Sequence, residues 1–390
     1  MSYLDKNDMN IFIKSILSIV TIVFITSCSN SNNEEPEIII PECRRTVLVY
    51  MVATNSLGAK GFDELDMEEM RTAMGNYKGG DCRFLVYRVV YNQVPQLIEI
   101  KNEGDKAVDV VLKNYTPTLH ASVTKQRFSE VINDIKTLAP AKDYGLILWS
   151  HSDGWATSLL YKSVAKPRDF GEDNGAKMHI DSLADALPEH TFSFIYADAC
   201  YMGAIEVAYQ LRKKIDYFVG SPAELPANGM QYDKNIPCFF EEEPDLLQAC
   251  RNTFDYYNSL SGDSRTLTIS LIDCSKLDKL ASVCKEIHSS ALPLTSVAGL
   301  QYYNRFQPRF FYDFGQYTNL IAANESLKEK FNEALGDAVI YKACTPAIFG
   351  SLFIDSENYS GLSTYIMGQG SIANEEYYLT LDWYKDVLNN

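Results

Sequence analysis

The sequence predicts an α/β fold with a mostly parallel central sheet. Apolar, β-branched runs alternate along the chain with segments whose apolar residues recur at helical spacing. The strand-like runs are almost continuously apolar, which is typical of strands buried on both faces of a sheet. We therefore expect helices to cover both faces.

The first half of the chain alternates strand and helix patterns. In the helix patterns, apolar residues fall on one face, as at Phe128, Ile132, Ile135 and Leu138. The expected elements, in order, are a strand at 45–54, a helix at 62–74, a strand at 82–90, a half-exposed strand at 96–101, a helix at 125–138, a strand at 144–149, a short helix at 180–187 capped by Asp181, a strand at 192–200 and a helix at 202–215.

The same alternation continues to the end of the chain without a linker rich in Pro, Gly or Ser. The expected elements are helix 245–260, strand 266–273, helix 275–292, helix 324–340 and strand 361–367. Because no linker intervenes, we expect residues 44–244 to form the core and residues 245–390 an extension packed on it.

Composition limits the function classes. The 390 residues are 46% hydrophobic, enough to fill a sizeable core. The formal net charge is -16, with 51 acidic against 35 basic residues, and this charge opposes binding to a phosphate backbone. Nucleic acid is therefore not an expected partner.

Residues 1–28 have the pattern of a secretory signal. Lys6 and Lys14 precede the apolar run of residues 15–28, which ends in small residues and Cys28. The end of this run resembles a bacterial lipoprotein cleavage box, which would make Cys28 the lipidated first residue, with an uncleaved N-terminal anchor as the alternative. Residues 29–43 read as a flexible tether, so the protein is expected on the outer membrane or cell surface, attached through its lipid.

Eight cysteines follow Cys28. Their even number permits disulfides in an exported protein, but the spacings are wide and irregular, and no CxxC pair suggests zinc. We expect most of them to be buried apolar side chains. No metal site is predicted from the sequence.

Two predicted strands end in reactive side chains. His151 follows the strand 144–149, and Cys200 closes the strand 192–200, about 50 residues later. Ligands of parallel α/β sheets bind outside the carboxyl ends of strands, so the imidazole and the thiol would share one crevice if the strands are neighbours. Taken singly, each residue is more often structural. The pair in this order, at the spacing of the caspase arrangement, favours a nucleophile and its base.

The motifs around these residues resemble the clostripain-like cysteine peptidases, family C11 of the caspase-gingipain clan. The similar segments span residues 45–385 and are, in order, 49-VYMVATNSL-57, 148-LWSHSDGW-155, 171-GEDNGAKMHIDSLADAL-187, 198-DACYMGAIEVAYQL-211, 220-GSPAELPANGMQYD-233 and 361-GLSTY-365. The resemblance implies a caspase-like α/β/α sandwich with a C-terminal α/β extension.

The resemblance also implies roles for individual residues. Cys200 would be the nucleophile and His151 the general base and later acid. Backbone N–H groups of Cys200 and Ser152 would hold the oxyanion, although the clan commonly has glycine at the position of Ser152. Thr54 stands where the family often has Asp, which leaves a supporting contact unassigned.

Neighbouring residues have less specific expectations. Gly154 would let the chain turn away from the site, and Trp155 would pack beneath it. Asp153 could orient the imidazole or simply cap its own turn. Some relatives use calcium, for which Asp169, Glu172 and Asp173 would be the place to look, although no ligand set is visible and no cofactor is predicted.

Substrate selectivity is expected for Arg or Lys at P1, the residue before the cleaved bond. Asp198 lies two residues before Cys200 on one strand, so both side chains point to the same face. A carboxylate there suits a basic P1 side chain, with a structural Asp paired within the protein as the alternative. Glu224 could add charge from the following loop.

Together these observations and the resemblance predict an exported, lipid-anchored cysteine endopeptidase that acts on proteins or peptides with a basic P1 residue. Self-processing is expected in the segment 156–177, after Lys162 or Arg168, because Pro167 makes the bond after Lys166 a poor target. The alternatives are an intact loop and, for the whole protein, a cell-surface binding lipoprotein that keeps the fold without catalysis. A metal-dependent hydrolase lacks the necessary ligand spacing.

Overall fold

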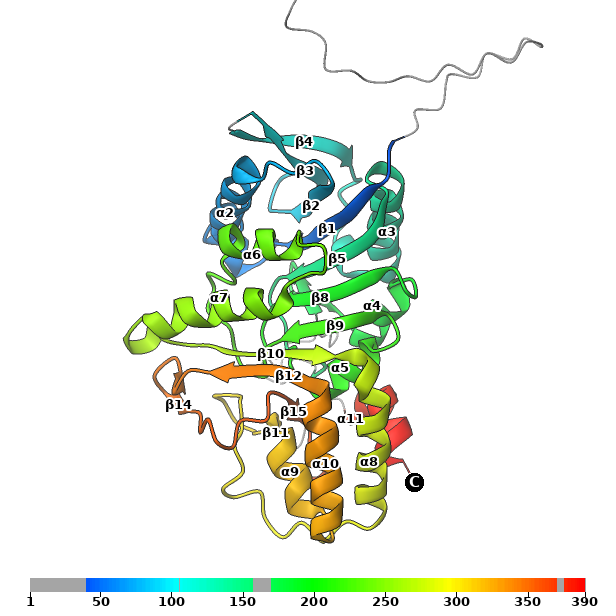
Figure 1. The fold of residues 1–390 in the computed structure, drawn as a ribbon, viewed down its shortest axis with the longest axis vertical. Helices are drawn as coiled ribbons and strands as arrows, with labels where there is room; N and C mark the ends of the chain where they lie inside the picture. The colour runs from blue at the N-terminus through cyan, green and yellow to red at the C-terminus, as the bar shows by residue number, and fades with distance from the viewer. Residues whose placement is uncertain (1–39, 105, 157–169, 370–374, 390) are drawn as a thin grey trace, which may run out of the picture. The chain divides into compact units, whose positions relative to one another are not determined.

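A mixed sheet with a parallel centre is the main element of the structure, a computed structural model that describes residues 40–104, 106–156, 170–369 and 375–389. Within these residues nine strands pair in the order β12-β10-β9-β8-β5-β1-β2-β3-β4 (Figure 1). The strands are β1 Cys43–Val52, β2 Cys82–Val89, β3 Gln96–Glu103, β4 Lys106–Asn114, β5 Ala141–Trp149, β8 Phe192–Asp198, β9 Ile215–Gly220, β10 Thr268–Asp273 and β12 Val339–Cys344.

The five central strands, from β9 to β2, are parallel to one another. Antiparallel strands extend the sheet on both sides, with β3 and β4 beyond β2, and β10 and β12 beyond β9. The expectation of a mostly parallel sheet is confirmed. Strand β4 was not predicted, because it forms the sheet's edge and none of its residues is buried.

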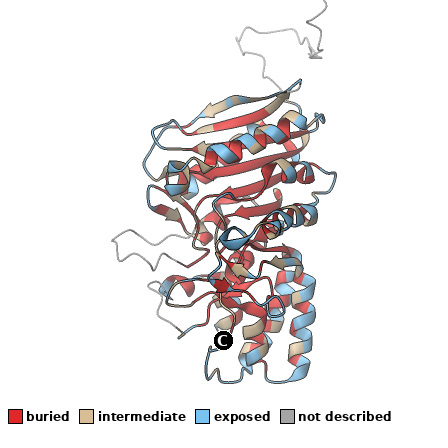
Figure 2. Ribbon diagram, turned by 90° about the vertical axis from the view of Figure 1, so that its left-hand side faces the viewer, coloured by how far each residue is buried: buried red, intermediate tan, exposed pale blue. Residues whose placement is uncertain are grey.

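Alternating residues of the central strands fill two separate hydrophobic cores. In β1, Val47, Val49 and Met51 belong to one core, whereas Leu48 and Tyr50 belong to the other. Figure 2 shows the buried residues running through the sheet, with exposed residues on the outer sides of the helices. The continuous apolar runs in the sequence are explained by this cover on both faces.

Helices pack on each face of the sheet (Figure 1). The helices of the first core are α2 Phe62–Asn76, α6 Tyr232–Phe239 and α7 Leu246–Ser259. The helices of the second core nearest the parallel strands are α3 Lys125–Leu138, α4 Ile180–Ala186 and α5 Ile205–Leu211. The arrangement is an α/β/α sandwich.

The part of the chain after residue 245 continues the same sheet. Strand β10 pairs with β9, and β12 pairs with β10. Its helices are α8 Leu277–Ser289, α9 Phe314–Ile321, α10 Glu325–Ala338 and α11 Glu375–Tyr378. Residues from Ile40 onward form one compact unit, in which this extension completes the sheet.

Short elements connect the larger ones. They are helix α1 Ser56–Ala59, the helical turns η1 Ala121–Val123, η2 Gly262–Ser264, η3 Cys274–Lys276 and η4 Tyr384–Leu388, and the strands β6 Phe170–Asp173, β7 Ala176–Met178, β11 Tyr312–Asp313, β13 Ala347–Ile348, β14 Leu352–Phe353 and β15 Ser363–Thr364.

Three local predictions need correction. The strand expected at 361–367 is only the two-residue β15, which pairs with β11 outside the main sheet. Helix α4 is preceded by His179, and Asp181 lies in its first turn, where it accepts from the Ser182 N–H at 2.6 Å rather than capping the helix. Helix α5 is shorter than the helix expected at 202–215.

The eight cysteines from Cys43 to Cys344 are all free thiols, and five of them are buried: Cys82, Cys238, Cys250, Cys274 and Cys284. This confirms the expectation that most are core side chains. Cys43, assigned to the tether, begins β1. None of the helices in the described part of the chain is long and apolar enough to cross a membrane. Cys28 and the rest of residues 1–39 lie outside the described residues.

Candidate active site

The two strands that carry His151 and Cys200 are adjacent and parallel. In the register of β5 and β8, Trp149 lies opposite Asp198. Each reactive residue follows two positions after this pair, so both side chains leave the same edge of the sheet. The expectation that the two strands are neighbours is confirmed, and it follows from the fold rather than from any local motif.

The imidazole of His151 is half-buried and contacts the turn after β1. Its Nε2 atom lies 2.8 Å from Oγ of Ser56, the first residue of α1. Burial lowers the pKa of His151 below its usual value, and Glu172 opposes this shift while Lys177 adds to it. The ring is therefore neutral at pH 7 and able to accept a proton.

Asp153 does not orient this ring. Its carboxylate forms an ion pair with Nζ of Lys177 instead. The sequence left open whether Asp153 holds the imidazole, and the structure gives that contact to Ser56. Sequence reasoning missed Ser56, although it lies inside the 49–57 segment that was compared with the family.

The thiol of Cys200 is half-buried beside the loop that follows β9. Its Sγ atom accepts from the backbone N–H of Leu225 at 3.3 Å. Burial raises the pKa of this thiol to about 12, with Glu224 adding to the shift. The thiol is consequently protonated at neutral pH.

Two tight turns bring the loops after β5 and β8 together. Gly154 has φ +66, and a Cβ atom there would lie 2.5 Å from the carbonyl oxygen of Tyr201. Tyr201 itself has φ +59, an uncommon conformation for a residue with a side chain. The positive φ fits the turn expected at Gly154, and the close approach is a further reason for glycine there.

Ser152 is buried beside the same loop. Its hydroxyl lies 3.1 Å from Sδ of Met202 and accepts from the N–H of Gly154 at 3.0 Å. The serine side chain thus connects the loop after His151 with the loop after Cys200. Its backbone pairs with Phe170 at the start of β6.

Asp198 is buried under the loop after β9. It accepts from the N–H of Met230 at 3.2 Å and from the hydroxyl of Tyr232 at 3.0 Å. A Cβ atom on Gly229 would lie 2.4 Å from Oδ2, so this glycine allows the loop to pass directly over the carboxylate. Burial raises the pKa of Asp198 to about 6. No Lys or Arg among the described residues pairs with it.

A second acidic side chain lies close to this strand pair and was not predicted. Asp66 of α2 accepts from Nε1 of Trp149 at 2.5 Å and is buried. Burial, with the nearby charge of Asp198, raises the pKa of Asp66 to about 9, so it is protonated at pH 7. Several other acidic residues lie in the same helix, so the sequence did not distinguish Asp66 from its exposed neighbours.

Glu224 has a partner from the C-terminal extension. Its carboxylate forms an ion pair with the guanidinium of Arg305, which also lies over the ring of Phe349. The negative charge of Glu224, which was expected to attract a basic P1 side chain, is thus already neutralised by Arg305. Thr54 donates to Oδ1 of Asp173 at 2.7 Å, which supplies a contact at the position where the family often has Asp.

Aromatic residues of the C-terminal extension support the two loops from below. Trp155 is buried against Phe311, Tyr365 and Tyr378, and Tyr201 stacks on Phe311 with ring centroids 4.8 Å apart. The expectation that Trp155 packs under the site is confirmed.

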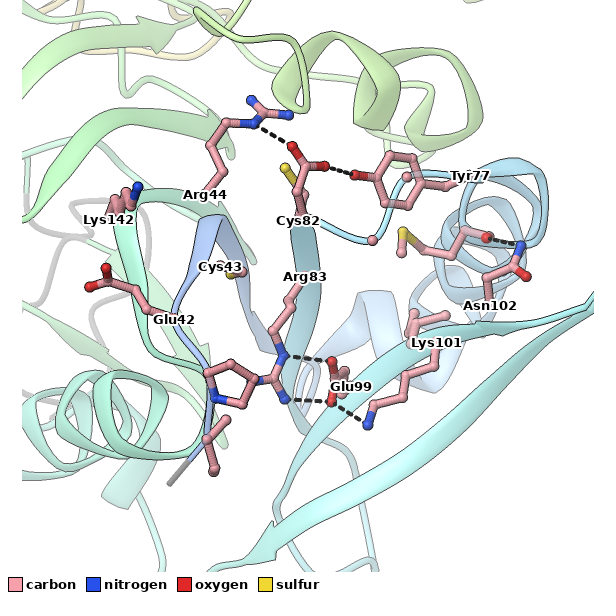
Figure 3. A pocket seen from close by; sticks show the side chains of 17 residues that line it. Glu42, Cys43, Arg44, Tyr77, Cys82, Arg83, Glu99, Lys101, Asn102 and Lys142 are labelled. Atoms are coloured by element: carbon pink, nitrogen blue, oxygen red, sulfur yellow. Dashed lines mark hydrogen bonds and ion pairs between the residues drawn. The ribbon is translucent and has the colours of Figure 1, made fainter. Parts of the chain in front are cut away.

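A large hollow in the described part of the chain lies elsewhere. It has a volume of about 780 Å³ and is lined by the first residues of β1 and β2. Figure 3 shows Arg83 paired with Glu99, and Arg44 forms an ion pair with Asp81. This hollow is therefore at the opposite ends of the strands from His151 and Cys200.

Metal binding finds no support among the described residues, which contain no group of three His, Cys, Asp or Glu side chains placed to hold an ion. Of the three acidic residues considered for calcium, Asp169 lies outside the described residues. The carboxylate of Asp173 already accepts hydrogen bonds from the Thr54 hydroxyl, the N–H of Ser122 and the side-chain amide of Asn174.

A parallel strand pair in an α/β/α sandwich, with a histidine and a cysteine at the same edge, defines the class of caspase-like cysteine peptidases. The model of the clostripain family, peptidase family C11, matches residues 49–388. The chain therefore belongs to the clostripain family and is a cysteine peptidase.

Solved structures of this family are similar over most of the chain. An inactive zymogen C11 protease from Parabacteroides distasonis has 32% identity and a TM-score of 0.77, covering 90% of this chain and 99% of its own. A secreted C11 cysteine protease from Bacteroides thetaiotaomicron, in complex with an irreversible peptide inhibitor, has 28% identity and a TM-score of 0.76, covering 88% and 99%.

A third structure covers less of the chain. A clostripain from Bacteroides thetaiotaomicron, in complex with the peptide inhibitor BTN-VLTK-AOMK, has 29% identity and a TM-score of 0.50, covering 56% of this chain and 97% of its own. Among curated proteins, no match to the sequence was found.

Proposed function

We propose that the protein is an endopeptidase in which Cys200 is the nucleophile and His151 the general base. The observation that carries this proposal is the register of β5 and β8, which brings both side chains to one edge of the sheet. Family membership supports the same pair, because the chain is a cysteine peptidase.

The protonation states of the two residues suit transfer of a proton during the reaction. The thiol has a raised pKa and the imidazole a lowered one, so the resting pair is uncharged at pH 7. As the sulfur attacks the peptide carbonyl, the thiol proton moves to His151, which then gives it to the leaving amine. Water hydrolyses the resulting thioester by the same route and restores the thiol.

The oxyanion of the tetrahedral intermediate would be held by backbone N–H groups of Cys200 and Ser152. Both residues lie on loops that approach closely where Gly154 meets Tyr201. Fixed donors at such a position stabilise charge that develops only in the transition state.

Selectivity for Arg or Lys at P1 is proposed to come from Asp198. This carboxylate is buried on the strand that leads to Cys200 and has hydrogen bonds but no cation among the described residues. A basic side chain would supply the missing charge and favour the ionised form. In support, the clostripain from Bacteroides thetaiotaomicron is in complex with the peptide inhibitor BTN-VLTK-AOMK. The last letter of its peptide, VLTK, stands for lysine.

Glu224 is proposed to contribute less to P1 binding than Asp198. Arg305 already neutralises it, so a substrate cation would have to displace this partner. An exposed pair of this kind contributes little to stability, and the exchange is therefore feasible during substrate binding.

The selectivity proposal is tested with Asp198→Asn, which keeps the size of the side chain. We expect kcat/KM to fall about 100-fold on peptides with Arg or Lys at P1, and to change less than threefold on matched peptides with Gln or Met there. Glu224→Gln is the matched control and should keep most of the basic selectivity. An equal loss on all peptides would assign Asp198 a structural role.

Self-processing between the two strands is also proposed. The candidate bonds after Lys162 and Arg168 lie outside the described residues, but their flanks at Ala156 and Phe170 are buried next to the site. A similar structure from Parabacteroides distasonis is an inactive zymogen. Mass spectrometry of wild type and Cys200→Ala should find fragments ending at Lys162 or Arg168 in the wild type alone.

Export with lipid attachment at Cys28 remains part of the proposal, supported by the signal-like sequence of residues 1–28. One similar solved protein is described as secreted. Metabolic labelling with a radioactive or clickable palmitate should mark the full chain and not Cys28→Ala. Labelling that persists in this variant would favour an uncleaved anchor or another acylation site.

A further inference from the structure

The hydroxyl of Ser56 is hydrogen-bonded to Nε2, one of the two ring nitrogens of His151, the candidate base. We propose that Ser56 is a positioning residue for His151, and that it fixes Nδ1 as the nitrogen that takes the proton of Cys200. This inference rests on the proposed role of His151 as general base.

The serine hydroxyl can donate to Nε2 or accept from Nε2–H, and the proposed arrangement is the one in which it accepts. Ser56 Oγ lies 2.8 Å from Nε2 and is the only hydrogen-bond partner of the ring among the described residues. When the serine oxygen accepts from Nε2–H, the neutral ring keeps its lone pair on Nδ1. The thiol proton then moves from sulfur to Nδ1, and the Nε2–H bond to Ser56 persists throughout.

Charged groups around the ring do not offer a competing orienting contact. Glu172, Asp153, Lys177 and Lys60 act on His151 through their charge, with no hydrogen bond to the ring. Asp153 is engaged by Lys177. In the absence of a carboxylate partner, the neutral serine acceptor holds the ring without making it strongly basic.

The turn that presents Ser56 is held by the side chain of Asn55. Its Nδ2 donates to the carbonyl of Val52 at 2.9 Å, to the carbonyl of Glu172 at 3.0 Å and to Oγ of Ser150 at 3.2 Å. Its Oδ1 accepts from the N–H of Leu57 at 2.9 Å. Asn55 thus ties the turn after β1 to the residue that directly precedes His151.

Close backbone packing fixes the same turn. A Cβ atom on Gly58 would lie 1.9 Å from the carbonyl oxygen of Ala53, so α1 folds back tightly on the end of β1. The hydroxyl of Ser150 donates to the carbonyl of Val52 at 2.8 Å and accepts from the N–H of Glu172 at 2.9 Å. Ser56 is therefore exposed but presented from a rigid support.

The test compares Ser56→Ala with Ser56→Thr on a peptide with Arg at P1. Loss of the contact should lower kcat about tenfold and leave KM within twofold, because in this proposal the hydroxyl acts through His151 and not on the substrate. Threonine keeps the oxygen and should restore kcat to within threefold of wild type. Ser289→Ala, at an exposed serine on α8, is the matched control and should match the wild type.

A pH profile separates positioning from a general structural role. The serine oxygen stabilises the imidazolium more than the neutral ring, so Ser56→Ala should move the acid limb of kcat/KM to lower pH. Imidazole ¹⁵N spectra should show His151 as the Nε2–H tautomer in wild type and as a tautomer mixture in Ser56→Ala.

Two outcomes would overturn the inference: wild-type kcat and an unchanged pH profile in Ser56→Ala, or an Nδ1–H tautomer in the wild type. Failure of the proposed function is distinguished by His151→Ala. If that variant keeps full activity, the general base is wrong; if it is inactive while Ser56→Ala behaves as wild type, only the positioning role is wrong.

Discussion

At the scale of single residues, burial determines the charge of the groups around the site. The imidazole of His151 is neutral and the thiol of Cys200 protonated in the resting protein. A resident thiolate-imidazolium pair would need the opposite shifts. The uncharged pair therefore favours a mechanism in which the proton moves as the sulfur attacks the substrate carbonyl.

This charge state predicts a one-sided pH profile. With an Arg or Lys peptide, kcat/KM should be flat from pH 7 to 9 and fall at least tenfold per unit at low pH, as His151 takes up a proton and as Asp198 protonates near pH 6. Initial rates measured between pH 4.5 and 9 check this. A falling limb between pH 7 and 9 would indicate that an imidazolium is required and contradict the neutral resting pair.

A buried carboxyl on α5 predicts how stability depends on pH. Glu206 accepts from Thr364 Oγ1 and from the N–H of Tyr365, both at 2.9 Å, and burial raises its pKa to about 7. Because the folded-state pKa is raised, its contribution to stability is complete below the unfolded pKa of about 4.5 and is lost as the pH rises through 7.

Glu206→Gln should therefore remove part of this pH dependence. Between pH 5 and pH 8 the wild type should lose about 3 kcal/mol more of its unfolding free energy than the variant, since each pKa unit is worth about 1.4 kcal/mol. Urea unfolding at both pH values measures the difference. Equal losses in the two proteins would mean that Glu206 is not buried as a neutral acid.

At the scale of elements, the site depends on segments that are far apart in the chain. Strands β5 and β8 carry the reactive residues, α1 contacts the histidine, and Phe311 of the C-terminal extension supports the loop after Cys200. The extension is thus part of the support of the active site as well as of the sheet.

Phe311→Ala tests this support. Deleting a fully buried phenylalanine costs about 3–5 kcal/mol, and its removal should also disturb Tyr201 beside Cys200. We expect a lower urea midpoint and at least a tenfold lower kcat. Phe353→Ala, at a side chain that is 77% exposed, is the control and should change stability by less than about 0.5 kcal/mol.

The sequence predicted the elements that have strong patterns. The strand of residues 144–149, the helix of residues 125–138 and the pairing of two strand ends all follow from apolar runs and from parallel-sheet geometry. Motif resemblance added the roles that are proposed for His151 and Cys200, and it agreed with the packing of Trp155.

Contacts between distant loops could not be predicted in this way. Ser56 and His151 are separated by 95 residues, and Glu224 and Arg305 by 81. Such pairs depend on the direction in which each loop leaves the sheet. The spacing of apolar residues along the sequence does not predict that direction. Edge strand β4 was missed for a related reason, because a strand without buried residues has no apolar run.

At the scale of the whole molecule, one sheet connects all parts of the described chain. The parallel centre positions the two reactive strand ends, and the antiparallel additions β10 and β12 join the extension to the same sheet. The active site is therefore a property of the complete fold. Family membership over residues 49–388 agrees with this, since the match includes the extension.

The central claim is that Cys200 is a nucleophile activated by His151 and directed to basic residues. Its most direct test is intact-mass spectrometry of the protein treated with an irreversible thiol-directed peptide inhibitor that carries Lys at P1. We expect one adduct, mapped to Cys200, that is absent in Cys200→Ala and forms at least 100-fold more slowly in His151→Ala. An adduct on another cysteine, or equal labelling of wild type and His151→Ala, would contradict it.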